Sequence, residues 1–103
     1  MRLIFAEPAE RDLDRIIDHI SLDSPNAAEK VYDTIVASAR RLTDFPKIGH
    51  AGRLPNTREL VVPSLPYLIV YQVGADIVTI LAVFHGARDL ARALADREKE
   101  LKQ

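Results

Sequence analysis

The chain has 103 residues, of which 48% are apolar and 28% charged, an ordinary composition for one globular domain that argues against disorder. Its formal net charge is -1, whereas proteins that bind nucleic acid through many phosphates usually carry an excess of lysine and arginine. The absence of cysteine excludes disulfides, thiolate catalysis and cysteine-based zinc sites. Neither a signal-peptide pattern nor a stretch of roughly 20 apolar residues is present, so we expect one cytoplasmic domain over residues 1–103 and no membrane partner.

The first half of the chain predicts a strand followed by two helices. Residues 2–5 are a short apolar run that is typical of a strand. Across residues 8–20, apolar side chains recur at helical spacing, which predicts an amphipathic helix of about four turns. Ser24–Pro25 suits the N-cap and first position of a second helix, and Phe45–Pro46 is expected to end it. Because the break between the helices is short, we expect an antiparallel helical hairpin.

The second half predicts a loop, three strands and a helix. Residues 46–57 contain two glycines and two prolines without periodicity, so they are predicted to form a long loop. Strands are then expected over residues 58–62, 67–73 and 76–84. Gly74–Ala75 is typical of a tight hairpin, and the last strand is almost continuously apolar, which predicts an internal strand covered on both faces. Helical spacing resumes over residues 87–94, and the charged residues 96–103 are expected to be a solvated helix end or a frayed tail.

These elements together predict an α+β fold. The expected architecture is an N-terminal strand, an antiparallel helical hairpin packed on a small, mostly antiparallel four-stranded sheet, and a C-terminal helix, in the order β-α-α-β-β-β-α. Charge is uneven along the chain, because residues 1–39 carry a net charge of −4 and residues 40–68 carry +3. The simplest interpretation of the positive segment is a solvated loop.

Six short motifs occur in a particular order along nearly the whole chain. They are Ala9–Ile16, Ser24–Ala28, Leu42–Gly49, Thr57–Leu60, Pro66–Tyr71 and Val83–Asp89. In this order and spacing the chain resembles the RelE/ParE superfamily of toxins from bacterial type II toxin–antitoxin modules. The resemblance implies a hetero-oligomer with a cognate antitoxin, ParD-like or RelB-like, and contact with operator DNA only through that antitoxin. It implies no cofactor.

Two residues match positions that carry chemistry in the ribonuclease branch of the superfamily. Arg58 matches an arginine that contacts the scissile phosphate there, and a guanidinium group suits that task. The alternative for Arg58 is a salt bridge to Glu59 or to a helix carboxylate. His85 matches a histidine that some members use as general acid or base. Because Gly86 follows, where those members often have a tyrosine or another polar residue, the simpler interpretation of His85 is a cap on the strand–helix turn.

A third candidate, Arg88, is expected in the first turn of the last helix. There it is placed to bind an anion together with free helix N–H groups, or to pair with a helix carboxylate or the acidic tail of the antitoxin. If the chain is RelE-like, the catalytic residues are therefore Arg58, His85 and Arg88. The three histidines, His19, His50 and His85, fall on different elements without ligand spacing, so we expect no metal site.

Three functions follow from the resemblance. A ParE-like toxin binds and poisons DNA gyrase, which needs no catalytic residue. A RelE-like toxin is an endoribonuclease that cleaves mRNA on the ribosome, and its branch is usually strongly basic and rich in lysine near the site. The third possibility is a non-toxic homologue that retains antitoxin binding. The near-neutral charge and only four lysines favour the ParE-like function.

Overall fold

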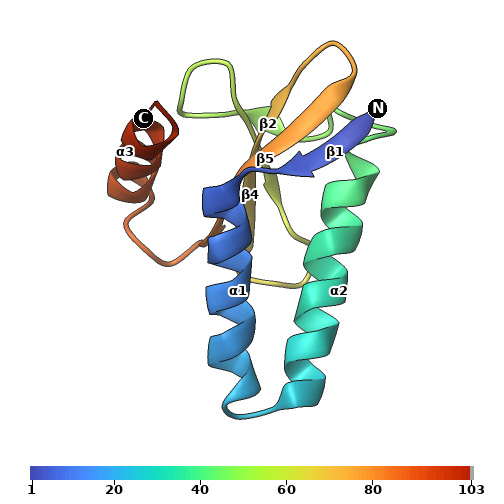
Figure 1. Cartoon of the computed structure of the whole chain (residues 1–103), viewed down its shortest axis with the longest axis vertical. Coiled ribbons are helices and arrows are strands. Elements are labelled where there is room, and N and C mark those ends of the chain that lie inside the picture. Colours follow the sequence, from blue (N-terminus) through green and yellow to red (C-terminus); the bar gives the residue numbers. More distant parts are fainter. Residues whose placement is uncertain (103) are drawn as a thin grey trace.

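Residues 1–102 are described by the computed structural model, in which a mixed five-stranded sheet carries a helical hairpin on one face and a C-terminal helix on the other (Figure 1). The strands are β1 (Arg2–Phe5), β2 (His50–Ala51), β3 (Arg58–Val61), β4 (Tyr67–Val73) and β5 (Ile77–His85). The helices are α1 (Glu7–Ser21), α2 (Pro25–Arg41) and α3 (Leu90–Leu101). The predicted α+β class and the order of its long elements are thereby confirmed.

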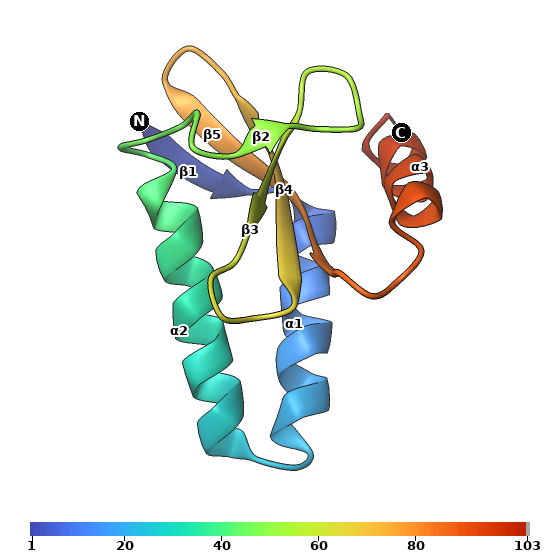
Figure 2. The same cartoon turned by 180° about the vertical axis from the view of Figure 1, so that it is seen from behind.

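The strands follow the order β1-β5-β4-β3-β2, with β1 parallel to β5 and every other pair antiparallel. The internal position expected for the last strand is confirmed, since β5 lies between β1 and β4. The expected strand count is one too low, because β2 forms inside the predicted loop 46–57 (Figure 2). This strand pairs His50 with Glu59 and Ala51 with Arg58. Two residues are too few to show an alternating pattern, so the sequence carries no strand signal there.

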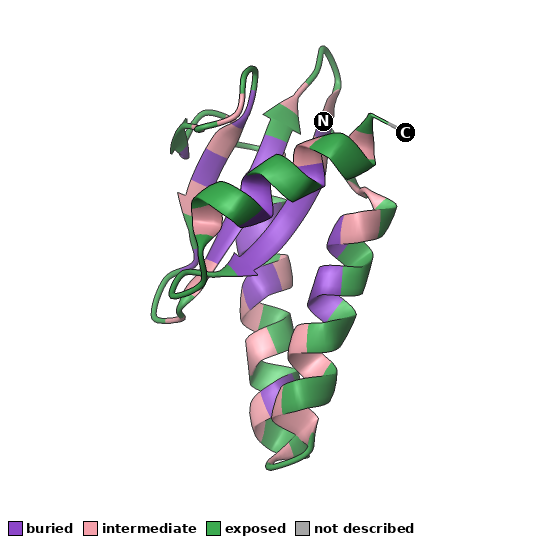
Figure 3. Cartoon of the chain, turned by 90° about the vertical axis from the view of Figure 1, so that its left-hand side faces the viewer, coloured by how far each residue is buried: buried purple, intermediate pink, exposed green. Residues whose placement is uncertain are grey.

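The helical hairpin forms as predicted. Ser24 caps α2, because its side-chain oxygen accepts a hydrogen bond from the Ala27 N–H at 3.2 Å. The second helix ends at Arg41, earlier than the expected stop at Phe45–Pro46, and the residues between continue as turns in which the Phe45 N–H still bonds to the Arg41 carbonyl. The far half of the hairpin extends beyond the sheet and is largely exposed (Figure 3).

Each face of the sheet has its own core. The hairpin-side core consists of Ala9, Leu13, Ile35, Ala39, Leu42, Val62, Ile69, Tyr71, Val78, Ile80 and Val83. The α3-side core consists of Leu68, Val70, Ala82, Phe84, Ala93 and Leu94. Alternate residues of β4 therefore enter opposite cores, as the two-residue period of a strand requires. Because β4 and β5 are covered on both faces, their sequences are almost continuously apolar.

A β-bulge interrupts the ladder between β4 and β5. Val70 pairs with Ala82 and Tyr71 pairs with Ile80, so Leu81 has no partner residue on β4. A bulge turns the extra residue and its neighbours relative to the regular ladder. Pairing of β5 with β1 also ends at Ile80, so beyond it the backbone groups of β5 on the β1 side need other partners.

The C-terminal segment differs from the expectation in two ways. Asp89 is the N-cap of α3, accepting from the Arg92 N–H at 3.2 Å, so Arg88 precedes the helix and does not lie in its first turn. Residues 96–101 are helical, in agreement with the expected helix end and not with a frayed tail, but Arg97 within them is buried and not solvated.

Candidate functional site

Arg58 begins β3, as predicted, but its guanidinium is bound to backbone. Its Nη2 donates to the carbonyl oxygens of Gly49 at 2.7 Å and Lys47 at 3.1 Å. The alternative of a salt bridge to Glu59 or a helix carboxylate is wrong, since no carboxylate of residues 1–102 lies within 4.0 Å of this side chain. Its Nε is buried and has no hydrogen-bond partner among the same residues.

The side chain of Tyr71 binds the same loop segment that Arg58 contacts. It lies opposite Arg58 across β3 and β4, and its hydroxyl donates to the Pro46 carbonyl at 2.8 Å while accepting from the Gly49 N–H at 3.0 Å. Gly49 is buried so close to these groups that an added Cβ would lie 2.6 Å from the Tyr71 hydroxyl and 2.6 Å from the Glu59 carbonyl oxygen. The turn after α2 is therefore pinned to the sheet by two side chains.

A small cavity adjoins this pinned turn. It has a volume of about 290 Å³, and it is lined by Lys47, Asn56, Thr57, Arg58 and Val73. Two of these side chains are cationic, and within the part of the chain that the structure describes neither has a carboxylate partner. The cavity is thus one place where the positive segment of the sequence offers uncompensated charge to an anion.

Glu59 takes a different partner from the one expected. Its side chain is fully buried, its Oε2 accepts from the Arg53 N–H at 3.0 Å, and the Arg53 Nε lies 3.8 Å from its Oε1. A buried carboxylate needs such donors, because leaving one unpaired costs several kcal/mol. The contact holds the loop that contains Arg53 against the α3-side face of the sheet.

His85 ends β5 and closes the turn that leads to α3. Its Nδ1 accepts from the Ala87 N–H at 3.0 Å, so a neutral ring carries its proton on Nε2. This is the geometry of the capping interpretation. The ring stands edge-on to the ring of Tyr67, with centroids 5.5 Å apart, and burial raises the pKa of the Tyr67 hydroxyl above its usual value. Arg88 is exposed in the same turn, and its guanidinium lies 4.8 Å from the centre of the Phe84 ring.

The structure does not bring the three predicted site residues together. Arg58 lies opposite Tyr71 and His85 lies opposite Tyr67, so their positions beside β4 are four residues apart, on two different neighbouring strands. Four residues of an extended strand span about 13 Å. Arg88 lies three residues beyond His85, at that same end of β4, so these two are neighbours while Arg58 is remote from both.

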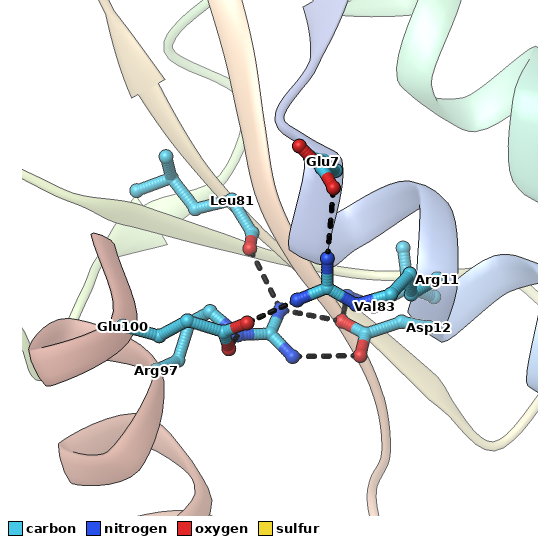
Figure 4. Close-up of polar contacts among 7 residues, drawn as sticks. All are labelled: Glu7, Arg11, Asp12, Leu81, Val83, Arg97 and Glu100. Carbon is cyan, nitrogen blue, oxygen red and sulfur yellow. Dashed lines mark hydrogen bonds and ion pairs between the residues drawn. The ribbon is translucent and has the colours of Figure 1, made fainter. Parts of the chain in front are cut away.

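A buried ion pair that the sequence did not predict joins α1, β5 and α3 (Figure 4). Nη1 and Nη2 of Arg97 donate to the two carboxylate oxygens of Asp12, each at 2.7 Å. The same carboxylate accepts from the Val83 N–H at 2.9 Å, and Nη1 of Arg97 also donates to the Leu81 carbonyl at 2.9 Å. Both side chains thus bond to each other and to the backbone of β5.

Further charges extend this pair toward the surface. Nε of Arg97 donates to Glu100 at 3.1 Å, and Arg11 contacts both Glu100 and Glu7. Burial lowers the pKa of Arg97, but the hydrogen bonds and charge of Asp12, assisted by Glu100, outweigh it and raise that pKa above its usual value. Arg97 is therefore permanently charged, and the network serves to hold α1, β5 and α3 together.

The signal for this pair lies in the spacing of the C-terminal residues. Leu90, Ala93, Leu94, Arg97 and Leu101 follow one another at three- and four-residue steps, so they share one face of a helix. An arginine on an otherwise apolar face indicates a buried cation that needs an acidic partner. The sequence alone does not indicate which of the many carboxylates supplies it.

Residues 1–102 contain no group of three or more His, Cys, Asp or Glu side chains arranged to hold a metal ion. Their helices include none that is both long enough and apolar enough to cross a membrane.

Two solved structures are similar to this one. A chain of the chromosomal ParDE toxin–antitoxin system from P. aeruginosa superposes with a TM-score of 0.74 at 27% identity, covering 82% of this chain and 95% of that one. The isolated E. coli RelE toxin shares the fold, with a TM-score of 0.56 at 19% identity over 94% of this chain and 96% of that one. The architecture is thus that of the small α+β toxins.

Sequence comparison identifies the family. The family described as "ParE toxin of type II toxin-antitoxin system, parDE" matches residues 3–90. A protein named "Putative toxin Y4kP" from Sinorhizobium fredii is 38% identical over 86 residues, which are 84% of this chain and 88% of that one. "Toxin RelE2" from Caulobacter vibrioides is 33% identical over 87 residues, 84% of this chain and 97% of that one. The chain belongs to the ParE toxin family, so the predicted RelE/ParE membership is confirmed.

Proposed function

We propose that this chain is a toxin that acts by binding and poisoning DNA gyrase, and that a cognate ParD-like antitoxin neutralises it. The observation that carries the proposal is the separation of Arg58 from His85 and Arg88. Cleavage of RNA by its own 2′-hydroxyl needs a base, an acid and a charge stabiliser around a single phosphate. Here the Arg58 Nη2 is engaged by two carbonyls, and His85 Nδ1 is engaged by the turn that it closes.

Charge supports the same function. The chain carries -1 overall, and of its four lysines only Lys47 lies in the cavity beside Arg58. A ribonuclease that grips RNA through many phosphates would lose affinity steeply at cellular salt with so few cations. Binding to a protein target does not require a broad positive surface.

The alternative, ribosome-dependent cleavage of mRNA, has one structural observation in its favour. Lys47 and Arg58 line a cavity of about 290 Å³ and have no carboxylate partner within residues 1–102, so a phosphate has two cations to meet there. A relative named as a RelE toxin is 33% identical to this chain. In this alternative Arg58, His85 and Arg88 are the catalytic residues, and the protein is an endoribonuclease.

Two assays on the purified chain test these functions together. We expect cleaved gyrase–DNA complexes to accumulate, no ribosome-dependent cuts in mRNA, and loss of the gyrase effect when the antitoxin is added. Arg58→Ala and His85→Ala should leave the gyrase effect in place, with His19→Ala as the control for replacing an exposed histidine. Cuts in mRNA that disappear in Arg58→Ala and His85→Ala would overturn the proposal in favour of the endoribonuclease. Inactivity in both assays would instead identify a non-toxic homologue.

A further inference from the structure

A rigidly held turn lies between α2 and β2 (Figure 2). The four residues from Phe45 to Ile48 form a β-turn, here called the 45–48 turn, in which the Ile48 N–H donates to the Phe45 carbonyl at 3.2 Å. The Tyr71 hydroxyl donates to the Pro46 carbonyl at 2.8 Å, and Nη2 of Arg58 donates to the next carbonyl along the chain at 3.1 Å. Because two side chains hold two successive peptide groups, the turn has its conformation before any partner binds, and loss of one side chain leaves the other in place.

The two large apolar side chains of this turn face solvent. Phe45 is 57% exposed and Ile48 is 42% exposed, although the backbone that carries them is bonded to side chains of β3 and β4. The first and fourth Cα atoms of a β-turn lie within about 7 Å of each other, so the two side chains start from neighbouring points on the surface. Exposed aromatic side chains on a preorganised backbone are typical of protein–protein interfaces, because little conformational entropy is lost when they bind.

Basic residues are in excess in and beside the turn. Residues 40–49 contain three basic residues and one acidic residue, Asp44. Lys47, between Phe45 and Ile48, is exposed, and it has no carboxylate within 4.0 Å among the described residues 1–102. The surface that fits this turn is therefore an apolar recess with carboxylates on its rim. Such a recess belongs to a protein, since a phosphate backbone offers anions and no apolar site for Phe45 and Ile48.

We propose that the 45–48 turn is the surface through which the chain binds its protein target. Phe45 and Ile48 enter an apolar recess of the target, and the Lys47 ammonium group faces a carboxylate at the rim of that recess. The inference rests on the proposed function, which supplies a protein target, and it adds which part of the toxin makes the contact. Arg58 and Tyr71 hold the turn together, so replacing Arg58 alone preserves the contact.

Paired substitutions test the apolar contact. Phe45→Ser combined with Ile48→Ser should raise the dissociation constant for purified gyrase at least about tenfold, equivalent to about 1.4 kcal/mol, because the recess then loses both apolar side chains. Leu22→Ser is the matched control, since this apolar side chain is 83% exposed at the tip of the hairpin. It should leave the dissociation constant unchanged. Equal constants for the double variant and the control overturn the inference.

Charge reversal tests the rim of the recess. Lys47→Glu should raise the dissociation constant for gyrase at least about fivefold at low salt, and by less at high salt, because repulsion replaces an ion pair. Lys30→Glu, at an exposed lysine on α2, is the control and should have no such effect. Lys47 is exposed and its side chain has no carboxylate partner within residues 1–102, so its replacement leaves the fold intact. Undiminished affinity of Lys47→Glu overturns the inference.

Antitoxin binding shows whether the loss is confined to the target. The probe is the antitoxin whose co-expression restores growth, and circular dichroism checks that each variant is folded. Antitoxin affinity should be unchanged in the variants of the 45–48 turn. A loss of antitoxin affinity equal to the loss of gyrase affinity overturns the inference, because the turn would then belong to the antitoxin surface.

Growth of cells that express the chain without antitoxin separates this inference from the proposed function. Growth arrest that disappears in Phe45→Ser with Ile48→Ser, and persists in Leu22→Ser, supports the inference even if gyrase is not the protein bound. Gyrase poisoning that survives the double substitution removes only the inference. Growth arrest with ribosome-dependent cuts in mRNA, or no growth arrest at all, removes both.

Discussion

The side chains of Asp12 and Arg97 supply hydrogen-bond partners for backbone groups at the edge of β5. Pairing with β1 stops at Ile80, and the bulge at Leu81 changes which backbone groups of β5 face that side. The Val83 N–H and the Leu81 carbonyl are then satisfied by these two side chains. Buried backbone groups almost always have partners, so α1 and α3 supply through side chains what a longer β1 would supply through its backbone.

Removing the arginine should therefore cost more than one ion pair. Arg97→Met leaves the Asp12 charge buried without its partner and the Leu81 carbonyl without its donor. We expect the free energy of unfolding to fall by about 3–5 kcal/mol, measured by urea titration. Arg92→Met, an exposed arginine on the same helix, is the control and should change it by less than about 0.5 kcal/mol. Similar midpoints for the two variants would contradict the structural role given to this pair.

At the scale of elements, the long helices and strands were predictable because periodicity repeats over many residues. Two features were not. The two-residue strand β2 is too short to show a period, and the buried helix end around Arg97 has the composition of a solvated tail. The candidate site was likewise predictable only in part. The sequence placed Arg58 and His85 correctly at strand ends, but the distance between them depends on the register of β3, β4 and β5. Strand register is a property of tertiary packing, which motif spacing does not encode.

The turn pinned by Arg58 and Tyr71 gives a prediction for one element. Gly49→Ala places a Cβ 2.6 Å from both the Tyr71 hydroxyl and the Glu59 carbonyl oxygen, so the turn must move away from the sheet. We expect a loss of about 1–3 kcal/mol in the free energy of unfolding.

Gly86→Ala is the matched substitution for that experiment. Its added Cβ would meet the Pro66 carbonyl oxygen at 3.5 Å, an ordinary contact, and its φ is not positive. Stability should rise slightly or stay within about 1 kcal/mol. If both alanine variants unfold at the same urea concentration, the close approach at Gly49 has no energetic consequence. The inference that Arg58 and Tyr71 hold this turn against the sheet would then be wrong.

On the scale of the whole molecule, the sheet separates two cores. The hairpin-side core and the strand residues of the α3-side core lie within residues 3–90, which match the family, whereas α3 begins where that match ends. The molecule measures 39 × 30 × 22 Å, and its long dimension reflects the far half of the hairpin (Figure 1). Residues 1–39 carry a net charge of −4 and residues 40–68 carry +3, so the two segments nearly cancel in the charge of the whole chain.

Deleting α3 should expose a continuous apolar face. A chain that ends at residue 89 uncovers Leu68, Val70, Ala82 and Phe84 and leaves Asp12 without Arg97. We expect it to bind a hydrophobic dye and to aggregate in gel filtration, as exposed apolar patches of this kind promote. A chain that ends at Leu101 is the control and should remain monodisperse. A well-behaved monomer after deletion of α3 would mean that α3 contributes little to the fold.

The parallel pairing of β1 with β5 has a consequence for the order in which the protein is made. Residues 2–5 wait for residues 77–80 before they have a neighbour, and Asp12 waits 85 residues for Arg97. At about 5–20 residues per second, translation takes several seconds before the first strand has its partner. Until then the available contacts are those of the helical hairpin and of the local pairs β2–β3 and β3–β4, because a loop of about 75 residues must close before β1 and β5 can pair. The β1–β5 pair and the buried pair of Asp12 and Arg97 are thus completed only after residues 77–97 have been made.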